Sequence, residues 1–349
     1  MKKIVVKIGS SVIAPAGKLD FGLVRAIVDD ILEAEDLGYE TVVVSSGAIA
    51  CGLNQLGLAK KPQEKSALMA LASLGQIILM DAYSRELAKR GRFCGQILLS
   101  WDDFDSRKRF LNASSTLRKL LDMDIIPVIN ENDAVSDDEI KFGDNDRLSA
   151  LTADLVGADT LIILSDVAGL LGERGQVIKQ VPCVDEAVYK LVKKKSGALT
   201  AGGMTTKLQA AEIVTNSGIK MVIASGKERM AISRICRGEE LGTAFLPASK
   251  VSAARKRWIA FSKKVKGRIY LDDGASDALL NKGRSLLGVG IIKVEGEFKK
   301  KDSVCVMDAA GRVIGCGLSN YSSDELCGCR EKKLAKEVIH RDNFVKQDR

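Results

Sequence analysis

The fold of the first part of this chain is decided by the stretch Ile125-Ile126-Pro127-Val128-Ile129-Asn130-Glu131-Asn132-Asp133. Its first five residues form an apolar run with the length and composition of a buried strand. Acids and amides follow where that strand ends, and a second polar group, Gly143-Asp144-Asn145-Asp146, comes soon after. Open α/β sheets bind their ligands beyond the carboxyl ends of the strands, so these side chains indicate a binding site. A solvated, turn-rich loop is the alternative interpretation, because Asn, Asp and Gly also form ordinary turns.

Further short apolar runs on both sides of this stretch predict an α/β domain. They lie at residues 3–8, 41–44, 96–99, 160–164 and 220–224, and helix-length segments separate them. Strands that alternate with helices predict a mostly parallel sheet covered by helices on both faces. After about residue 247 the pattern changes to short strands parted by Gly and Asp turns, at 267–271, 290–294, 303–307 and 313–317. We expect a small β-rich, barrel-like domain there.

The charge of the chain is distributed unevenly along its 349 residues, a length that suggests about two domains. Residues 248–349 contain 22 Lys and Arg against 13 Asp and Glu, whereas residues 1–247 contain 31 against 32. The whole basic excess therefore belongs to the last hundred residues. This asymmetry indicates two domains with different partners.

Composition excludes several classes of protein. The only histidine is His340, which argues against histidine-based triads and metal sites. The eight cysteines show neither a disulfide framework nor the paired spacing of zinc sites, so we predict no protein-bound metal and a reducing cytoplasm. We find no charged-then-apolar leader and expect no apolar segment of 18 residues, which predicts a cytoplasmic protein without a membrane span.

Small residues and lysines at the expected strand ends indicate phosphate binding. Lys7 is followed by the turn Gly9-Ser10-Ser11, and Ser46-Gly47-Ala48 is a similar turn. A third glycine-rich loop, Ala201-Gly202-Gly203-Met204-Thr205-Thr206-Lys207, leads into a helical pattern and would place Lys207 in the first helical turn. No Walker A loop, dinucleotide fingerprint or protein-kinase signature occurs. Lys7 alone could also be an ordinary strand-edge lysine.

These segments together carry a family resemblance. The motifs are residues 5–11 (VVKIGSS), 43–52 (VVSSGAIACG), 127–135 (PVINENDAV), 142–150 (FGDNDRLSA) and 202–211 (GGMTTKLQAA). They closely resemble the amino acid kinase family, and residues 109–113 and 157–159 extend the match through nearly all of residues 1–247. In the basic tail, residues 257–259, 273–275 and 285–287 are similar to a PUA domain. The resemblance implies a catalytic domain at 1–247, a linker at 248–266, a PUA domain at 267–343 and a tail at 344–349.

Within this family the motifs are similar to the enzymes that use ATP to phosphorylate the γ-carboxylate of L-glutamate, the first step of proline biosynthesis. The resemblance implies that Lys7 and Lys207 stabilise the transferred phosphoryl group and that Asp146 orients them. It implies that ATP with Mg²⁺ binds through Lys7, Gly9, Ser165, Asp166, Ala201, Gly202, Gly203, Met204, Thr205, Thr206 and Lys207. It implies that glutamate binds through Ser46, Gly47, Asn130, Asp133, Asp144 and Asn145.

The resemblance also implies proline as a feedback inhibitor and a homo-oligomer, either a dimer or a tetramer. Two alternatives to this activity stay open. Another carboxylate kinase of the family would act on aspartate or N-acetylglutamate, but an N-acetylated substrate offers no ammonium to the acids. An RNA-binding or RNA-modifying protein is suggested by the basic tail, which nevertheless lacks the dense aromatic residues of a base-stacking surface. Weak RNA binding by the tail is the part of that alternative we retain.

Overall fold

The structure, a computed structural model, describes residues 1–135, 145–195, 201–249, 251, 253–327 and 334–346. It divides into two compact units, Met1–Val251 and Ser252–Arg349. Each unit has its own sheet and its own hydrophobic core. The change in sequence pattern near residue 247 therefore coincides with a change in architecture.

The first unit is built on an eight-stranded sheet with the order β3-β4-β2-β1-β5-β7-β8-β6. Six strands from β3 to β7 run parallel, whereas β8 is antiparallel to β7 and parallel to β6. The mostly parallel sheet is thus confirmed, and all six predicted strands are present. The short β6 and β8 were not predicted. The strands are β1 (Lys2–Ile8), β2 (Tyr39–Ser45), β3 (Phe93–Leu99), β4 (Ile125–Glu131), β5 (Thr160–Ser165), β6 (Gln180–Val181), β7 (Lys220–Ser225) and β8 (Thr243–Phe245).

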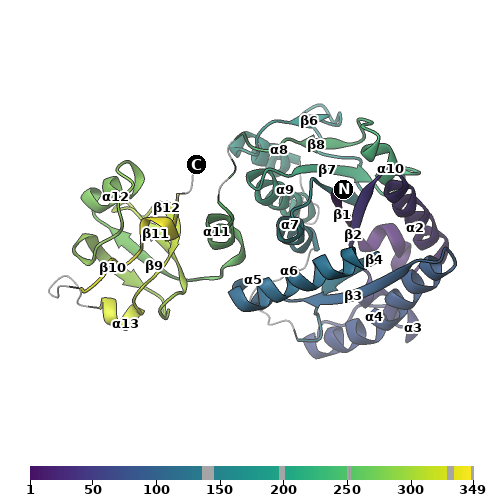
Figure 1. Ribbon diagram of the computed structural model, residues 1–349, viewed down its shortest axis with the longest axis horizontal. Coiled ribbons are helices and arrows are strands. Elements are labelled where there is room, and N and C mark those ends of the chain that lie inside the picture. Colours follow the sequence, from purple (N-terminus) through teal and green to yellow (C-terminus); the bar gives the residue numbers. More distant parts are fainter. Residues whose placement is uncertain (136–144, 196–200, 250, 252, 328–333, 347–349) are drawn as a thin grey trace. The chain divides into compact units, whose positions relative to one another are not determined.

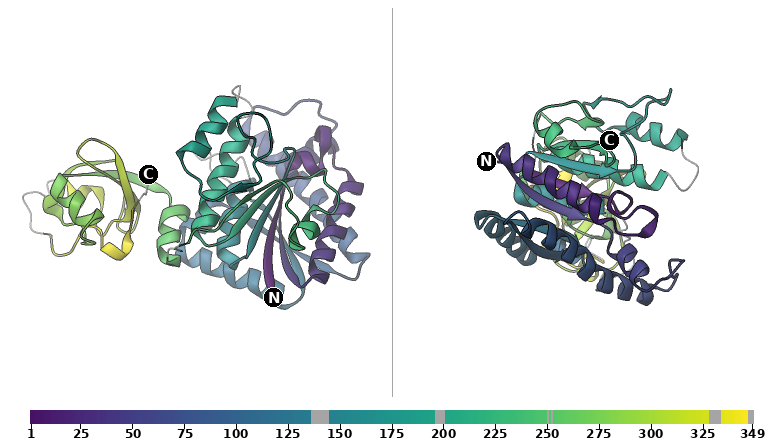
Figure 2. Two further views of the ribbon diagram at one scale, coloured as in Figure 1. Left: turned by 90° about the horizontal axis from the view of Figure 1, so that it is seen from above. Right: turned by 90° about the vertical axis from the view of Figure 1, so that its right-hand side faces the viewer.

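Helices cover both faces of this sheet (Figures 1 and 2). One face carries α2 (Phe21–Asp36), α4 (Lys65–Ala88) and α10 (Ala231–Cys236), and the other carries α6 (Arg107–Asp122), α7 (Asn145–Val156) and α9 (Ala201–Asn216). Central strands such as β1 are buried on both faces, which explains their continuous apolar sequence. The shorter helices are α1 (Ser10–Ile13), η1 (Pro15–Gly17), α3 (Ala48–Gln55), α5 (Trp101–Asp105) and α8 (Glu186–Lys195).

Helix α4 corrects one expectation from the sequence. Its 24 residues are long and apolar enough to cross a membrane by length and composition, so the prediction that no such segment exists is wrong. The helix nevertheless packs against α2, α3 and β3, and its side chains Leu79, Tyr83 and Leu87 lie in the core of the first unit. Its apolar composition is that of a core helix covering a sheet.

Two glycines let α4 lie very close to α3. A Cβ added to Gly75 would lie 1.8 Å from the carbonyl oxygen of Ala48, and one added to Gly52 would lie 2.1 Å from that of Leu71. No side chain fits at either position without moving a backbone. Because α3 begins directly after Gly47, this close contact fixes the position of the turn that follows β2.

The expected glycine-rich loop at 201–207 is a helix. Helix α9 begins at Ala201, so Lys207 lies in its second turn and not in its first. Glycine weakens a helix by about 1 kcal/mol relative to alanine, which favoured the loop in the sequence. Hydrogen bonds from Thr206 Oγ1 and Lys207 Nζ to Asp146 on α7 help to offset that penalty.

The second unit contains a five-stranded mixed sheet with the order β10-β9-β11-β12-β13. All four predicted strands are present, and side chains such as Ile269, Val304 and Ile339 form its core. The strands are β9 (Val265–Leu271), β10 (Ile291–Glu295), β11 (Ser303–Met307), β12 (Val313–Leu318) and β13 (Phe344–Lys346). The helices are α11 (Ala254–Arg257), η2 (Trp258–Ser262), α12 (Asp273–Leu280), η3 (Gly288–Gly290), α13 (Ser323–Leu326) and η4 (Arg341–Asn343).

The segments expected as a linker and a tail both contain secondary structure. The expected linker 248–266 contains α11 and η2, and Ile259 within it is buried. The expected tail 344–349 begins with β13, which pairs with β12. The buried side chains of Ile259 and Phe344 lie in these two segments.

Candidate functional site

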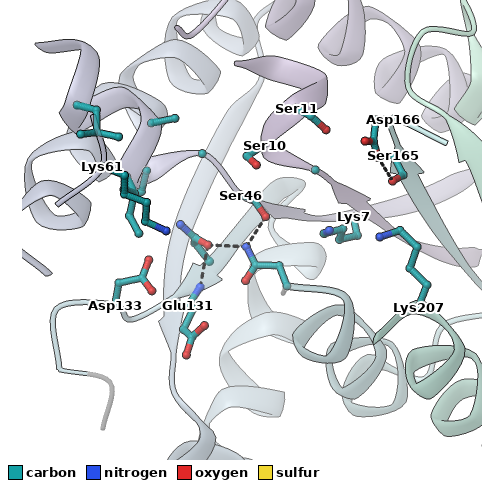
Figure 3. A pocket seen from close by; sticks show the side chains of 18 residues that line it. Lys7, Ser10, Ser11, Ser46, Lys61, Glu131, Asp133, Ser165, Asp166 and Lys207 are labelled. Atoms are coloured by element: carbon teal, nitrogen blue, oxygen red, sulfur yellow. Dashed lines mark hydrogen bonds between the residues drawn. The ribbon is translucent and has the colours of Figure 1, made fainter. Parts of the chain in front are cut away.

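A cavity of about 500 Å³ opens at the carboxyl ends of the parallel strands of the first unit (Figure 3). Residues that follow β1, β2, β4 and β5 meet there, together with Lys207 from α9. This is the edge of the sheet at which the sequence predicted a site. The lining consists of Lys7, Gly9, Ser10, Ser11, Ser46, Gly47, Ala48, Ile49, Ala50, Leu53, Lys61, Asn130, Glu131, Asp133, Asn145, Ser165, Asp166 and Lys207.

One end of the cavity contains two lysines bound to one aspartate. Lys7 Nζ lies 2.7 Å from Asp146 Oδ1, and Lys207 Nζ lies 3.0 Å from Asp146 Oδ2. Asp146 is completely buried, and the two lysine side chains are 5% and 8% exposed. Lys207 Nζ also donates to the carbonyl oxygen of Gly203, 3.2 Å away. The carboxylate thus holds two ammonium groups, which come from β1 and α9, beside one another at the cavity wall.

The middle of the cavity is lined by a network of amides. Asn145 Nδ2 donates to Ser46 Oγ at 2.7 Å and to Asn130 Oδ1 at 2.8 Å. Asn130 Nδ2 donates in turn to Gln76 Oε1 at 2.8 Å, and Asn130 Oδ1 also accepts from the backbone N–H of Glu131. The network joins β2, α4, β4 and α7. Gln76 was not predicted, because a single polar residue within an apolar helix gives no signal in the sequence.

The two small-residue turns play different structural roles. Gly47 has φ +119°, a conformation that favours glycine, and it precedes α3 directly. The backbone N–H of Gly9 donates to the carbonyl oxygen of Leu164 at 3.1 Å, which ties β1 to β5. That N–H is therefore not available to a phosphate. The first backbone N–H groups of an α-helix have no acceptor within the helix, and the first three residues of α3, Ala48, Ile49 and Ala50, line the cavity.

The opposite end of the cavity contains Asp133, Glu131 and Lys61. Burial raises the pKa of the Asp133 carboxyl above its ordinary value, and the positive charge of Lys61 opposes this rise. Figure 3 shows Lys61 reaching toward Asp133 from the connection between α3 and α4, well separated from Lys7 and Lys207. Lys61 was missed in the sequence, since it lies in a polar loop outside the motifs.

Only some of the residues predicted to bind the nucleotide line the cavity. Ser165 and Asp166 line it beside Lys207, and Ser165 Oγ donates to Asp166 Oδ1 at 3.0 Å. Gly203, Met204, Thr205 and Thr206 lie in α9 outside its lining, although a Cβ added to Gly203 would meet nothing within 4 Å. Two further predicted residues, Ala201 and Gly202, begin α9, and predicted Asp144 lies outside the described residues.

Within the described part of the chain, no three His, Cys, Asp or Glu side chains gather in a way that would hold a metal ion. Asp146 is engaged by two lysines, and among the other carboxylates of the cavity Asp166 follows β5, whereas Glu131 and Asp133 lie at the end of β4. This set of side chains fits a magnesium ion carried by a nucleotide, because Mg²⁺ keeps several waters and needs few protein carboxylates when phosphates are present.

Similarity to known proteins is extensive. Residues 2–225 match the amino acid kinase family, and residues 267–341 match the PUA domain. The chain is 44% identical to the glutamate 5-kinase of Caldanaerobacter subterraneus over 365 residues, with 99% of this chain and 98% of that protein covered. It is 41% identical to the glutamate 5-kinase of Syntrophotalea carbinolica over 362 residues, with 99% and 97% covered.

Among solved structures, Giardia carbamate kinase superposes with a TM-score of 0.51 and 17% identity, covering 71% of this chain and 99% of that one. At this identity the likeness concerns the fold alone. This likeness agrees with the parallel sheet and its two helical layers. The two glutamate 5-kinases match nearly the full length of the chain at much higher sequence identity. The chain therefore belongs to the amino acid kinase family, and within it to the glutamate 5-kinases, with a PUA domain after the kinase domain.

Proposed function

We propose that this protein transfers the γ-phosphoryl group of ATP to the γ-carboxylate of L-glutamate, giving γ-glutamyl 5-phosphate for proline biosynthesis. The observation that carries this proposal is the buried Asp146 with Lys7 and Lys207 at one end of a cavity that has polar partners for an amino acid at the other. The names and coverage of the relatives support glutamate as the acceptor.

The two lysines offset the repulsion between two anionic reactants. A carboxylate oxygen of glutamate attacks the γ-phosphorus in line, and the bond to the β,γ-bridging oxygen breaks, so ADP leaves with the electron pair. Catalysis of such transfers depends on positioning and charge stabilisation. Lys7 and Lys207 would contact the β- and γ-phosphoryl oxygens, and Asp146 keeps both ammonium groups in place before the reaction. No general base is required, because the attacking carboxylate is already ionised at neutral pH.

The nucleotide would lie along α9 and the end of β5. Ser165, Asp166 and Lys207 line this side, and the open space over Gly203 leaves room for close approach to the first turns of α9. The predicted residues 201–206 would then contact ATP from the helix and not from a loop. Mg²⁺ bound to the phosphates would neutralise their charge, and Asp166 is a carboxylate of the cavity lining on the same side as Lys207 (Figure 3).

Glutamate would extend from the lysines toward Asp133. Ser46 and Gly47 would lie beside the γ-carboxylate in this arrangement, since both line the cavity directly before α3, and the positive end of a helix dipole favours an anion there. Asn130 and Asn145 hold the wall of the cavity in shape through their shared hydrogen bonds. Asp133 would accept a hydrogen bond from the α-ammonium, and Asp144 was predicted to assist it.

The proposal extends to a cytoplasmic enzyme that forms a dimer or tetramer and is inhibited by proline. Hydroxylamine trapping of the acyl phosphate, with and without proline, tests activity and inhibition together. We expect hydroxamate to form only with both ATP and L-glutamate, and light scattering should give the oligomeric state. Product from L-aspartate or N-acetyl-L-glutamate in place of L-glutamate would overturn the assigned substrate.

A second proposed function is weak RNA binding by the second unit. A cavity of about 210 Å³ in that unit is lined by four cationic side chains, Lys256, Arg284, Arg341 and Lys346, and by one acid, Asp342. Contacts to phosphates weaken steeply as salt rises. We expect the full chain to retard the migration of tRNA in a native gel at low salt, and to do so much less at physiological salt. No shift at low salt would remove RNA binding from the functions of this protein.

A further inference from the structure

The cavity contains a third cation that neither the phosphoryl-transfer chemistry nor the family motifs use. Lys61 lies in the connection between α3 and α4, is exposed, and lines the cavity at the end opposite Lys7 and Lys207. In Figure 3 its side chain extends toward Asp133, and Glu131 lies on the same side of the view. The far end of the cavity therefore has one cation beside carboxylates, whereas at the near end two cations share the buried carboxylate of Asp146.

Asp133 and Lys61 affect one another electrostatically. The positive charge of Lys61 lowers the pKa of the Asp133 carboxyl, against the rise that burial causes. Lys61 thus helps to keep Asp133 ionised, which an ammonium-binding carboxylate must be. The exposed position of Lys61 leaves its ammonium accessible to a ligand that enters the cavity.

The amides of the cavity are poor candidates for binding a substrate carboxylate. Asn145 uses its Nδ2 group on Ser46 Oγ and Asn130 Oδ1, and Asn130 uses one N–H of its own on Gln76. A carboxylate needs hydrogen-bond donors, and charged donors give the stronger bonds. Among the described residues that line the far end, Lys61 is the charged donor.

An α-amino acid has an ammonium and a carboxylate on the same carbon atom. A site that binds both groups needs an acceptor anion and a donor cation a few ångströms apart, with the side-chain carboxylate directed elsewhere. Asp133 and Lys61 provide this combination, and the lysine end lies where the second carboxylate of the substrate must react.

We propose that Lys61 binds the α-carboxylate of the substrate amino acid, beside Asp133, which binds its α-ammonium. This inference rests on the proposed glutamate kinase activity. It makes Lys61 a determinant of specificity for a free α-carboxylate, a role that differs from the phosphoryl-binding role of the other two lysines.

The test compares L-glutamate with its α-amide, L-isoglutamine, which keeps the α-ammonium and the γ-carboxylate. Each is assayed with the wild-type protein, Lys61→Met, Lys61→Arg and the control Lys60→Met, which alters an exposed neighbour outside the cavity lining. We expect Lys61→Met to raise the KM for glutamate about tenfold with kcat nearly unchanged, the effect of losing one partly solvated charged hydrogen bond. Lys61→Arg should recover most of the loss.

The decisive result is whether the ratio of kcat/KM for glutamate to that for isoglutamine differs between the wild-type protein and Lys61→Met. Wild-type protein should use isoglutamine about tenfold less efficiently than glutamate, and Lys61→Met should use the two with nearly equal kcat/KM. An equal loss for both substrates would show that Lys61 acts only through Asp133 or the loop, and would overturn the inference, as would a variant indistinguishable from Lys60→Met. A wild-type protein inactive on glutamate would instead overturn the proposed function.

Discussion

The two ends of the cavity differ in how their charges are held. At the lysine end, Asp146, Lys7 and Lys207 are buried, and each ammonium has a fixed carboxylate partner. At the far end, Lys61 is exposed and Asp133 is only partly buried. Fixed, buried charges stabilise a transition state without reorganisation, whereas solvated charges adapt to a ligand and can release it. The contrast indicates that chemistry occurs at the rigid end and substrate recognition at the adaptable one.

Replacing the shared carboxylate should have the largest effect on the rigid end. Asp146→Asn leaves two buried ammonium groups without a counter-charge, so we expect the free energy of unfolding to fall by about 3–5 kcal/mol. Denaturant unfolding measures this change. The control is Asp81→Asn, which removes an exposed pair with Arg85 and should cost less than about 1 kcal/mol. Equal losses in the two variants would contradict the distinction between fixed and solvated charges.

Removing either lysine of the rigid end should chiefly lower turnover. We expect Lys7→Ala or Lys207→Ala to reduce kcat by about 10²–10³, the typical effect of losing one transition-state charge donor. Steady-state assays at saturating ATP and glutamate measure it, with the exposed Lys227→Ala as control. A variant that keeps kcat within about threefold of wild type would exclude that lysine from the chemical step.

At the adaptable end, Asp133→Ala should weaken binding and spare chemistry. Loss of one charge-assisted hydrogen bond to the α-ammonium predicts a glutamate KM that rises about 10- to 100-fold, while the KM for ATP and kcat change little. Initial rates over a range of glutamate concentrations separate these quantities. If the KM for glutamate stayed at its wild-type value, Asp133 would have no part in recognition.

The pH dependence should give the smallest but most specific signal. Asp133 binds an ammonium only when ionised, and its pKa is raised by burial, so kcat/KM for glutamate should fall as the pH drops toward that raised pKa. Lys61 lowers this pKa, and Lys61→Met should therefore move the acid limb of the profile to higher pH. Profiles of both proteins check the direction, and a shift toward lower pH would contradict the pairing.

Much of the rigid end was predictable from the sequence because its residues lie in regular local patterns. Lys7 ends an apolar run, and Asp146 follows a polar cluster that itself follows a strand. The parallel order of the strands then requires their carboxyl ends to share one edge. The adaptable end was only half predicted: Asp133 belongs to the motif after β4, whereas Lys61 lies in a loop with no pattern of its own.

Three further features depended on long-range contacts. Helix α9 begins at Ala201 despite the low helix propensity of Gly202 and Gly203, and Thr206 and Lys207 in it donate hydrogen bonds to Asp146 on α7. Backbone N–H groups near Gly9 were expected to cradle a phosphate, and the N–H of Gly9 itself is engaged by the carbonyl oxygen of Leu164 on β5. The buried Gln76 accepts a hydrogen bond from Asn130 on β4, and it lies in α4 directly after Gly75, where that helix contacts α3 closely.

The sequence by itself determined the two architectures, the edge of the sheet that carries the site, and the family to which the chain belongs, because hydrophobic periodicity and short motifs are local properties of the chain. Only the tertiary structure decided which donors remain for a substrate. Hydrogen bonds between residues far apart in the sequence, such as that from Asn145 to Ser45 across 100 positions, engage some polar groups and leave others, Lys61 among them, at the cavity.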